Sequence, residues 1–352
     1  MTINRNVLLY GVIQMKSKIF LFAGLLLATS QMFAGVTKVG TTAAGFLMID
    51  VGSRANGMGS AFVSIADDAT AMYWNPAGIA GIDGFEVTFC NSKWIGDLGF
   101  TYTGAVQSLG QLGNIGINAT FLTMEEIERT TIAYPDGSGE YFDAGCYAVG
   151  LSYARKLTDN FSIGFNTKLI NERMYHSSAS GFALDIGALF DTQLSGLKLG
   201  MCISNYGTKM HLDGRDLQVQ HDISESISGN NDLINARLQT DYFDLPLLLR
   251  FGVSMDVLKG FMNSNLILSA DALHPSDDTE YINLGAEYKF FNLLSLRVGF
   301  KQLFAKDSEQ GLTFGGGIRY KLRGTTTFCF DYSYSDFGLL NSVNIFSVGL
   351  AF

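Results

Sequence analysis

Few residues in this sequence have the types and spacing that chemistry requires. The motifs G-x-S-x-G, H-E-x-x-H, G-x-x-x-x-G-K and C-x-x-C do not occur, so nucleophilic, zinc, phosphate-binding and redox signatures are missing. Two histidines, His211 and His221, share one expected loop, but nothing else in the sequence supports a metal pair there. We therefore expect a protein that is not an enzyme and that holds no cofactor and no metal.

Asp67 and Asp68 are adjacent carboxylates that could be taken for an acid–base pair. They open the stretch 66–74, which is typical of one or two helical turns, and carboxylates stabilise a helix N-terminus. Asn75, Pro76, Ala77 and Gly78 follow as a turn that ends the helix. The simpler interpretation gives the two acids a structural role.

Composition limits the class of protein further. The chain has 352 residues, of which 47% are apolar and 16% are charged, and it contains 40 glycines. Intrinsic disorder is excluded by the apolar and aromatic content. Nucleic-acid binding is disfavoured because the formal net charge is −9. After residue 30 no window offers the ~20 continuous apolar residues of a membrane-spanning helix.

The N-terminus has the organisation of an export signal. Lys16 and Lys18 precede an apolar run over 19–28, and small residues lead to a plausible cleavage site after Ala34. We expect residues 1–34 to be a signal peptide, with Met15 as the true start. The mature protein would then leave the cytoplasm.

From residue 84 onward, apolar and polar residues alternate with a period of two, which is typical of strands with one apolar face. The spacing predicts fourteen strands, and most have ten or more residues, as membrane-spanning strands require. The predicted strands are 84–94, 97–107, 115–124, 143–156, 161–174, 182–191, 197–206, 246–257, 265–273, 281–290, 293–302, 311–320, 325–335 and 343–352. The predicted fold is all-β: a fourteen-stranded antiparallel transmembrane β-barrel over 84–352, in contact with outer-membrane lipid.

The lengths of the links favour an outer-membrane barrel over a soluble sandwich. The long links 125–142 and 207–245 both follow odd-numbered strands, whereas links after even-numbered strands are short. An even strand count puts both termini on the short-turn side, which would be the periplasm. By parity the charged face lines the lumen, with internal ion pairs as one interpretation and a charged transport path as the other. These lumen residues are Lys168, Asp185, Asp271, Glu287, Arg297, Lys301, Arg319 and Asp331.

The last strand ends in Phe352, and Leu350 and Val348 share its face. This pattern resembles the C-terminal signal by which barrel proteins reach the outer-membrane assembly machinery. The four cysteines, Cys90, Cys146, Cys202 and Cys329, also face the lumen by parity, on strands that are not neighbours. Such strands separate Cα atoms by more than the ~7 Å that a disulfide permits, so we expect free thiols.

Residues 35–83 do not alternate, and here the sequence becomes recognisable. The run from Gly52 to Val63, with Ala66-Asp67-Asp68-Ala69 and Trp74-Asn75-Pro76-Ala77-Gly78, resembles the start of PorV/PorQ-family proteins in the wider FadL-like barrel group. The resemblance is specific over about residues 40–80. It implies that residues 35–83 form a hatch folded into the barrel, with Asn75-Pro76-Ala77 as its hallmark.

The resemblance implies two alternative functions. PorV-like members act in type IX protein secretion and bind exported cargo or partner proteins. FadL-like members pass hydrophobic small molecules through the hatch and a lateral opening. The acidic loop 207–245, with Asp213, Asp216, Asp222, Glu225 and Asp232, is either a protein-docking surface or a flexible solvated loop.

Overall fold

The structure is a computed structural model that describes residues 40–352 except 193, 195, 223–225, 227–232, 259–263, 306–307 and 323. The expected signal peptide, residues 1–34 with Met15, therefore lies outside the described residues, as do Glu225 and Asp232. No described helix is both long enough and apolar enough to cross a membrane.

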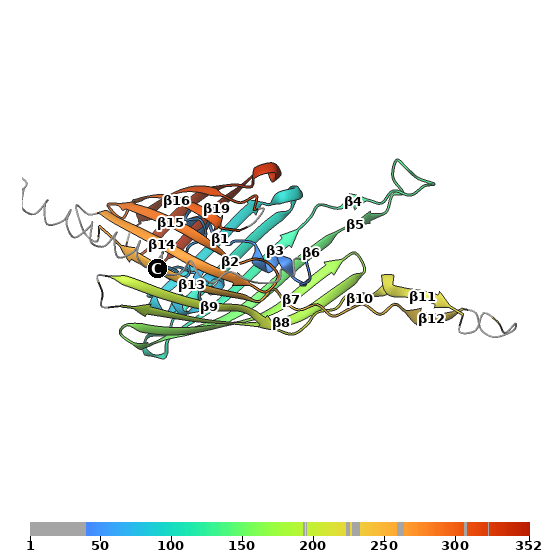
Figure 1. Cartoon of the computed structure of the whole chain (residues 1–352), viewed down its shortest axis with the longest axis horizontal. Coiled ribbons are helices and arrows are strands. Elements are labelled where there is room, and N and C mark those ends of the chain that lie inside the picture. Colours follow the sequence, from blue (N-terminus) through green and yellow to red (C-terminus); the bar gives the residue numbers. More distant parts are fainter. Residues whose placement is uncertain are drawn as a thin grey trace, which may run out of the picture.

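In the described part of the chain, fourteen antiparallel strands close into a barrel, with β1 paired to β19 and β8 paired to β9 (Figure 1). This confirms the predicted fold class. The strands of the ring are β1 (Phe85–Lys93), β2 (Gly99–Ser108), β3 (Asn114–Thr123), β6 (Ala144–Thr158), β7 (Phe161–Met174), β8 (Ser177–Asp191), β9 (Leu197–Gly207), β13 (Leu248–Asp256), β14 (Ser264–Pro275), β15 (Tyr281–Phe290), β16 (Leu294–Leu303), β17 (Leu312–Lys321), β18 (Thr327–Asp336) and β19 (Ser342–Ala351).

The predicted strand positions agree with the ring to within a few residues, with β8 as the largest difference. The sequence places its start at residue 182, whereas the strand begins at Ser177. Its first residues are Ser, Ala and Gly, which carry little hydropathy pattern, yet they continue the pairing with β7 as far as Met174. Backbone hydrogen bonding extends this strand where side-chain alternation gives no signal.

The two faces of the wall differ as the alternation predicts. On β18, Phe330, Tyr332 and Tyr334 are exposed on the outside, while Ser333 and Ser335 are buried inside. An apolar exterior is what a lipid environment requires, because a polar face there would lose its hydrogen bonds to water. The hydrogen-bonded register continues around the ring, with irregularities in the β6–β7, β8–β9 and β15–β16 pairs.

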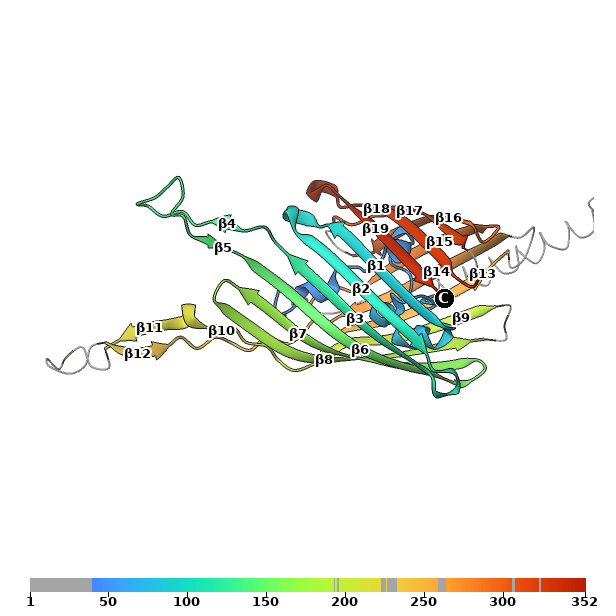
Figure 2. The same ribbon diagram turned by 180° about the vertical axis from the view of Figure 1, so that it is seen from behind.

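The two ends of the barrel are unequal, and we name them by their links. The short-turn end carries the links after β2, β6, β8, β13, β15 and β17, together with the C-terminus. The long-loop end carries two extensions, residues 124–143 and 208–247, and their described parts reach far beyond the other loops (Figures 1 and 2). Their elements are the hairpin β4 (Ile127–Glu128) and β5 (Tyr141–Phe142), the strand β10 (Asp213–Gly214) and the hairpin β11 (Gln218–His221) and β12 (Ile234–Arg237).

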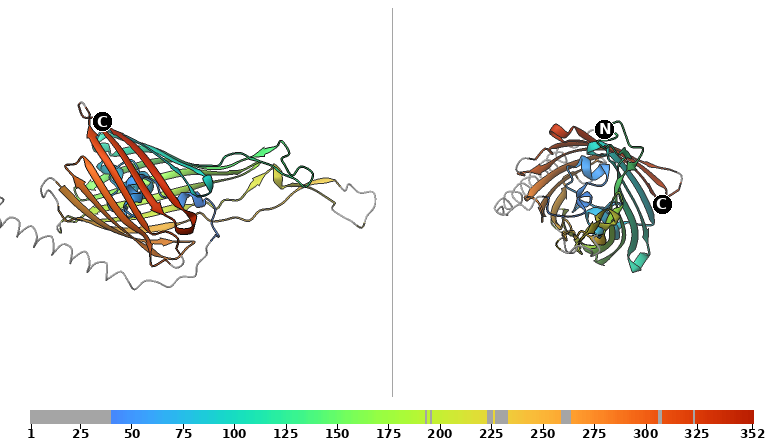
Figure 3. Two further views of the ribbon diagram at one scale, coloured as in Figure 1. Left: turned by 90° about the horizontal axis from the view of Figure 1, so that it is seen from above. Right: turned by 90° about the vertical axis from the view of Figure 1, so that its right-hand side faces the viewer.

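The N-terminal residues 40–83, which we call the inner segment, fold inside the barrel (Figure 3). Their apolar side chains form two clusters with the inner wall: Phe46 and Val51 pack with Tyr102, and Met72 packs with Val106. The inner segment contains η1 (Gly45–Met48), α2 (Ser53–Gly57), α3 (Ala71–Trp74) and η2 (Pro76–Gly81), and short 3-10 turns elsewhere are η3 (Ile95–Asp97), η4 (Gly110–Leu112), η5 (Arg215–Leu217) and η6 (Gly338–Leu340).

Candidate functional site

The Asn75-Pro76-Ala77-Gly78 motif connects separate parts of the inner segment with one another and with the barrel wall. The Asn75 amide donates to the carbonyl of Val63 at 2.9 Å and to that of Ala188 on β8 at 3.0 Å. Its carbonyl oxygen accepts from the Ala77 amide at 3.2 Å and so caps η2. One side chain therefore ties three segments together.

The wall makes room for this motif with inward-facing glycines. A Cβ at Gly187 on β8 would overlap the Asn75 side chain, and one at Gly164 on β7 would overlap the Pro76 backbone. Gly78 itself lies so close to the Ala66 carbonyl that no side chain fits there. The sequence contains many glycines, but only the structure shows that Gly164 and Gly187 leave room for the inner segment against the wall, a contact we call its seat.

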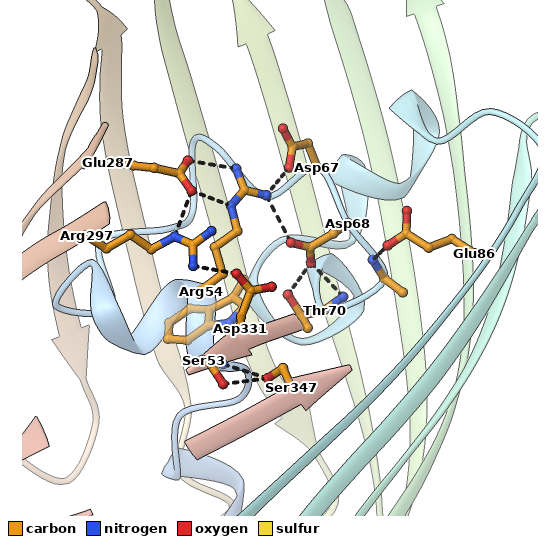
Figure 4. A network of polar contacts seen from close by, with 12 residues as sticks. Ser53, Arg54, Asp67, Asp68, Thr70, Glu86, Glu287, Arg297, Asp331 and Ser347 are labelled. Atoms are coloured by element: carbon orange, nitrogen blue, oxygen red, sulfur yellow. Dashed lines mark hydrogen bonds and ion pairs between the residues drawn. The ribbon is translucent and has the colours of Figure 1, made fainter. Parts of the chain in front are cut away.

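A network of ion pairs fixes the other side of the inner segment, and Arg54 of α2 is its centre (Figure 4). Arg54 contacts Asp67 and lies 3.0 Å from Asp68 within the inner segment. On the wall it donates through Nε and Nη2 to the two oxygens of Glu287, both at 3.2 Å. A bidentate pair of this kind is stronger than a single hydrogen bond and fixes the orientation of both groups. Glu287 is fully buried.

The wall continues the network from Glu287. Arg297 donates to Glu287 at 2.8 Å and to Asp331 at 2.5 Å, and Lys289 lies 3.3 Å from Glu287. Elsewhere, Lys168 pairs with Asp185 and Lys301 pairs with Asp50 of the inner segment. Most of the lumen charges named from the sequence therefore form internal ion pairs.

Asp271 on β14 holds the inner segment through its backbone. One carboxylate oxygen accepts from the amides of Phe62 and Val63, at 2.7 and 2.9 Å. On the opposite wall, the Ser53 amide donates to the Ser347 hydroxyl at 2.9 Å. Arg54 and Ser53 could not be predicted as anchors from periodicity, because neither lies in a periodic segment. The available signal was a single arginine in a Gly-rich, apolar run.

Asp67 and Asp68 do not serve a helix N-terminus as expected, because α3 begins only at Ala71 and has no acid in its first turn. Asp68 accepts instead from the Thr70 amide at 3.0 Å, and both acids pair with Arg54. The Asp67 side chain is about 61% exposed to the cavity. Desolvation inside the barrel opposes its ionisation, but the attraction of Arg54 outweighs this and lowers the pKa of Asp67 to about 2.

Several cavities border the inner segment, and two of them lie at opposite ends of the barrel. The larger, about 490 Å³, lies at the short-turn end between Arg54, Asp67 and the wall from β15 to β1, and charged groups line it. The other, about 390 Å³, lies at the long-loop end and is mainly apolar, with Phe46, Ile49 and Trp94 among its lining residues. Polar contacts of the inner segment fill the space between them.

The extensions combine negative charge with exposed apolar groups. Residues 124–143 carry six carboxylates and one arginine, and residues 208–247 carry seven carboxylates and three basic side chains. Ile132 and Tyr134 are exposed on the first extension, and Leu238 and Tyr242 on the second. Of the acids singled out from the sequence, Asp213 pairs with Arg237 and Asp216 with His176.

The remaining predicted residues are placed as parity requires. Phe352 and Val348 are exposed on the outer face, Leu350 shares that face, and the Phe352 ring lies 6.0 Å from that of Phe85. All four cysteines are free. The histidines lie at the long-loop end, and the described residues contain no cluster of His, Cys, Asp or Glu suited to a metal.

Comparisons with known proteins agree with this architecture. Among solved structures, the chain is similar to the CymD monoaromatic hydrocarbon channel, with a TM-score of 0.54 at 12% identity, covering 86% of this chain and 97% of that one. The Ralstonia pickettii toluene transporter TbuX gives a TM-score of 0.51 at 11% identity, with the same coverage. At such identities the likeness shows the fold alone. No curated protein matches the sequence.

The sequence itself carries a family relationship. The family described as type IX secretion system protein PorV matches residues 34–235, which is more than half of the chain. The match includes the whole inner segment. Because this match covers more than half of the chain, and because the fold is a closed outer-membrane barrel, the chain belongs to the PorV family.

Proposed function

We propose that this chain is a non-enzymatic binding barrel of type IX secretion, which holds exported cargo or partner proteins through its long-loop end. The observation that carries the proposal is the pair of extensions, 124–143 and 208–247, which project from one rim (Figure 2). Exposed apolar groups such as Tyr134 and Tyr242 would become buried when a partner protein binds, which favours binding. The carboxylates of the extensions would select for partners with complementary charge.

The filled lumen supports a binding role over a channel role. The inner segment (expected as a hatch over 35–83) is held against the wall by Asn75, Asp271 and the Arg54 network, so that it occupies the inside of the barrel. In this proposal Asn75, Pro76, Ala77 and Gly78 keep the hatch seated, and Asp67 and Asp68 hold Arg54.

The proposal also assigns an orientation in the outer membrane. The short-turn end, where β1 begins and β19 ends, faces the periplasm. The extensions face the outside of the cell. Phe352, Leu350 and Val348 form the outward-facing signal for barrel assembly.

An affinity purification from native outer membranes tests the function. The tagged protein is compared with a variant in which residues 127–142 are replaced by a short Gly-Ser turn, and with a control in which the short link 338–340 is replaced instead. Secreted cargo or secretion components should co-purify with the wild type and the control and be lost from the 127–142 variant. Equal recovery from all three proteins would contradict a role for this extension.

The apolar cavity supports a second candidate, a channel for hydrophobic small molecules. Phe46, Ile49 and Trp94 line it, and such walls suit an apolar ligand. Lipid extraction of the same purified protein tests this alternative. A bound hydrophobic compound that is lost on Phe46→Asp substitution, without any protein partner, would favour the channel.

A further inference from the structure

The charges around the cavity at the short-turn end do not balance locally. Five basic and five acidic side chains line its 490 Å³. Arg54, Arg297 and Lys289 are neutralised by Asp67, Asp68, Glu287 and Asp331, as described above. Three lining groups remain outside these ion pairs: Arg319, Lys321 and Glu86.

The two remaining bases form one basic wall. Arg319 and Lys321 lie two residues apart on β17, so both side chains point into the lumen about 7 Å from each other. Among the described residues neither forms an ion pair within 4 Å with a carboxylate. Arg319 contacts its cross-strand neighbour Cys329, and Lys321 pairs across the strands with Thr327. A group with several anionic oxygens would fit two such donors better than one carboxylate would.

The remaining acid lies on a different strand of the same cavity. Glu86 begins the inward-facing row of β1 and accepts a hydrogen bond from the Ala69 amide at 2.7 Å. Among the described residues it forms no ion pair within 4 Å, and Arg319 is a nearby base that attracts it across the cavity. The cavity therefore offers two bases on β17 and one acid on β1, with space for a small molecule between them.

We propose that this cavity binds a zwitterionic ligand of the phosphoethanolamine class. The phosphate lies between Arg319 and Lys321, and the ammonium group pairs with Glu86. The same headgroup chemistry occurs on a soluble phosphoethanolamine and on a membrane phospholipid, and both can reach the short-turn end. This site is independent of cargo binding at the extensions.

Calorimetric titration of the purified barrel in an uncharged detergent tests the proposal. The probes are phosphoethanolamine, inorganic phosphate, and phosphatidylethanolamine supplied in nanodiscs that hold the protein. Arg319→Gln with Lys321→Gln should weaken phosphoethanolamine binding at least about tenfold, because a hydrogen bond to a charged group is worth about 1.5–3 kcal/mol. Glu86→Gln keeps the acceptor for Ala69 and should weaken phosphoethanolamine binding but not phosphate binding.

The outcomes separate the two sources and allow the proposal to fail. Binding of soluble phosphoethanolamine with this pattern supports a soluble ligand, and the same pattern with phosphatidylethanolamine alone supports a lipid headgroup. Lys93→Gln, a charge change at the long-loop end, is the matched control and should bind as the wild type does. The proposal is overturned if neither phosphoethanolamine nor phosphatidylethanolamine binds, or if either Glu86→Gln or the double variant binds them as the wild type does.

Discussion

Replacing Arg54 with methionine should release the inner segment from the wall without opening the barrel. The substitution removes two 3.2 Å hydrogen bonds to the buried Glu287 and the contacts to Asp67 and Asp68. Asp67 is largely exposed, so that contact contributes less than about 1 kcal/mol. Glu287 keeps Arg297 and Lys289, which holds the total near the lower limit for breaking a buried pair, about 3 kcal/mol.

A loss of about 3 kcal/mol corresponds to a roughly 100-fold larger population in which the inner segment has left its seat. Cys90 reports this opening, because its buried thiol lies in the apolar cluster that Phe46 and Val51 form with the wall. When opening and closing are fast, the labelling rate by a maleimide follows the open population. We expect Cys90 to react about 100-fold faster in Arg54→Met, measured by mass spectrometry of its peptide.

Two controls isolate the effect. Cys329 lines the cavity and is only partly buried, so its labelling rate should stay the same in every variant. Arg129→Met removes an exposed ion pair with Glu140 on the extension and should leave Cys90 labelling unchanged. The reasoning is refuted if Arg54→Met labels Cys90 within threefold of the wild-type rate while the barrel keeps its heat-modifiable migration.

Three other changes, two substitutions and one deletion, give separate tests. Gly187→Ala should destabilise the packing of the inner segment against β8 by about 1–3 kcal/mol, because its Cβ would overlap Asn75. A Cβ at Gly316 would make only an ordinary contact, 3.8 Å from the Ser295 carbonyl oxygen, so Gly316→Ala should have no effect on thermal unfolding. Deletion of Phe352 should reduce the heat-modifiable fraction recovered in outer membranes, and normal recovery would remove its role in assembly. The pKa of Asp67 is lowered to about 2, so its stabilising contribution is present above about pH 4 and is lost as the pH falls towards 2; the stability difference between wild type and Asp67→Asn, followed by tryptophan fluorescence, should vanish over that range.

The barrel was predictable because every strand of the ring repeats the same physical requirement. Lipid-facing side chains must be apolar, and the next residue along the strand faces the lumen. The types of Phe330 and Ser333 therefore show which face of β18 each lies on without knowledge of the tertiary structure. The extension of β8 back to Ser177 was not predictable, since backbone pairing continues there among small residues that favour neither face.

The contacts of the inner segment could not be obtained from the sequence in the same way. Glu287 and Arg297 were assigned to the lumen by parity, but their common partner Arg54 lies 233 residues before Glu287 in a segment without period. The stretch 66–74, expected to form one or two helical turns, contains the single turn α3, which begins only at Ala71. The expected role of the two acids at its N-terminus was wrong, because Asp67 and Asp68 pair with Arg54 instead.

The hydrogen bond between Ser53 and Ser347 spans 294 residues, which determines when the inner segment can fold. A chain that crosses the inner membrane N-terminus first presents this segment early and the last strand at the end. Until then, apolar groups such as Met58 and Phe62, fully buried in the finished protein, lack their surroundings. Such exposed groups aggregate readily, so we expect the β1–β19 seam to close only after the segment is inside the barrel.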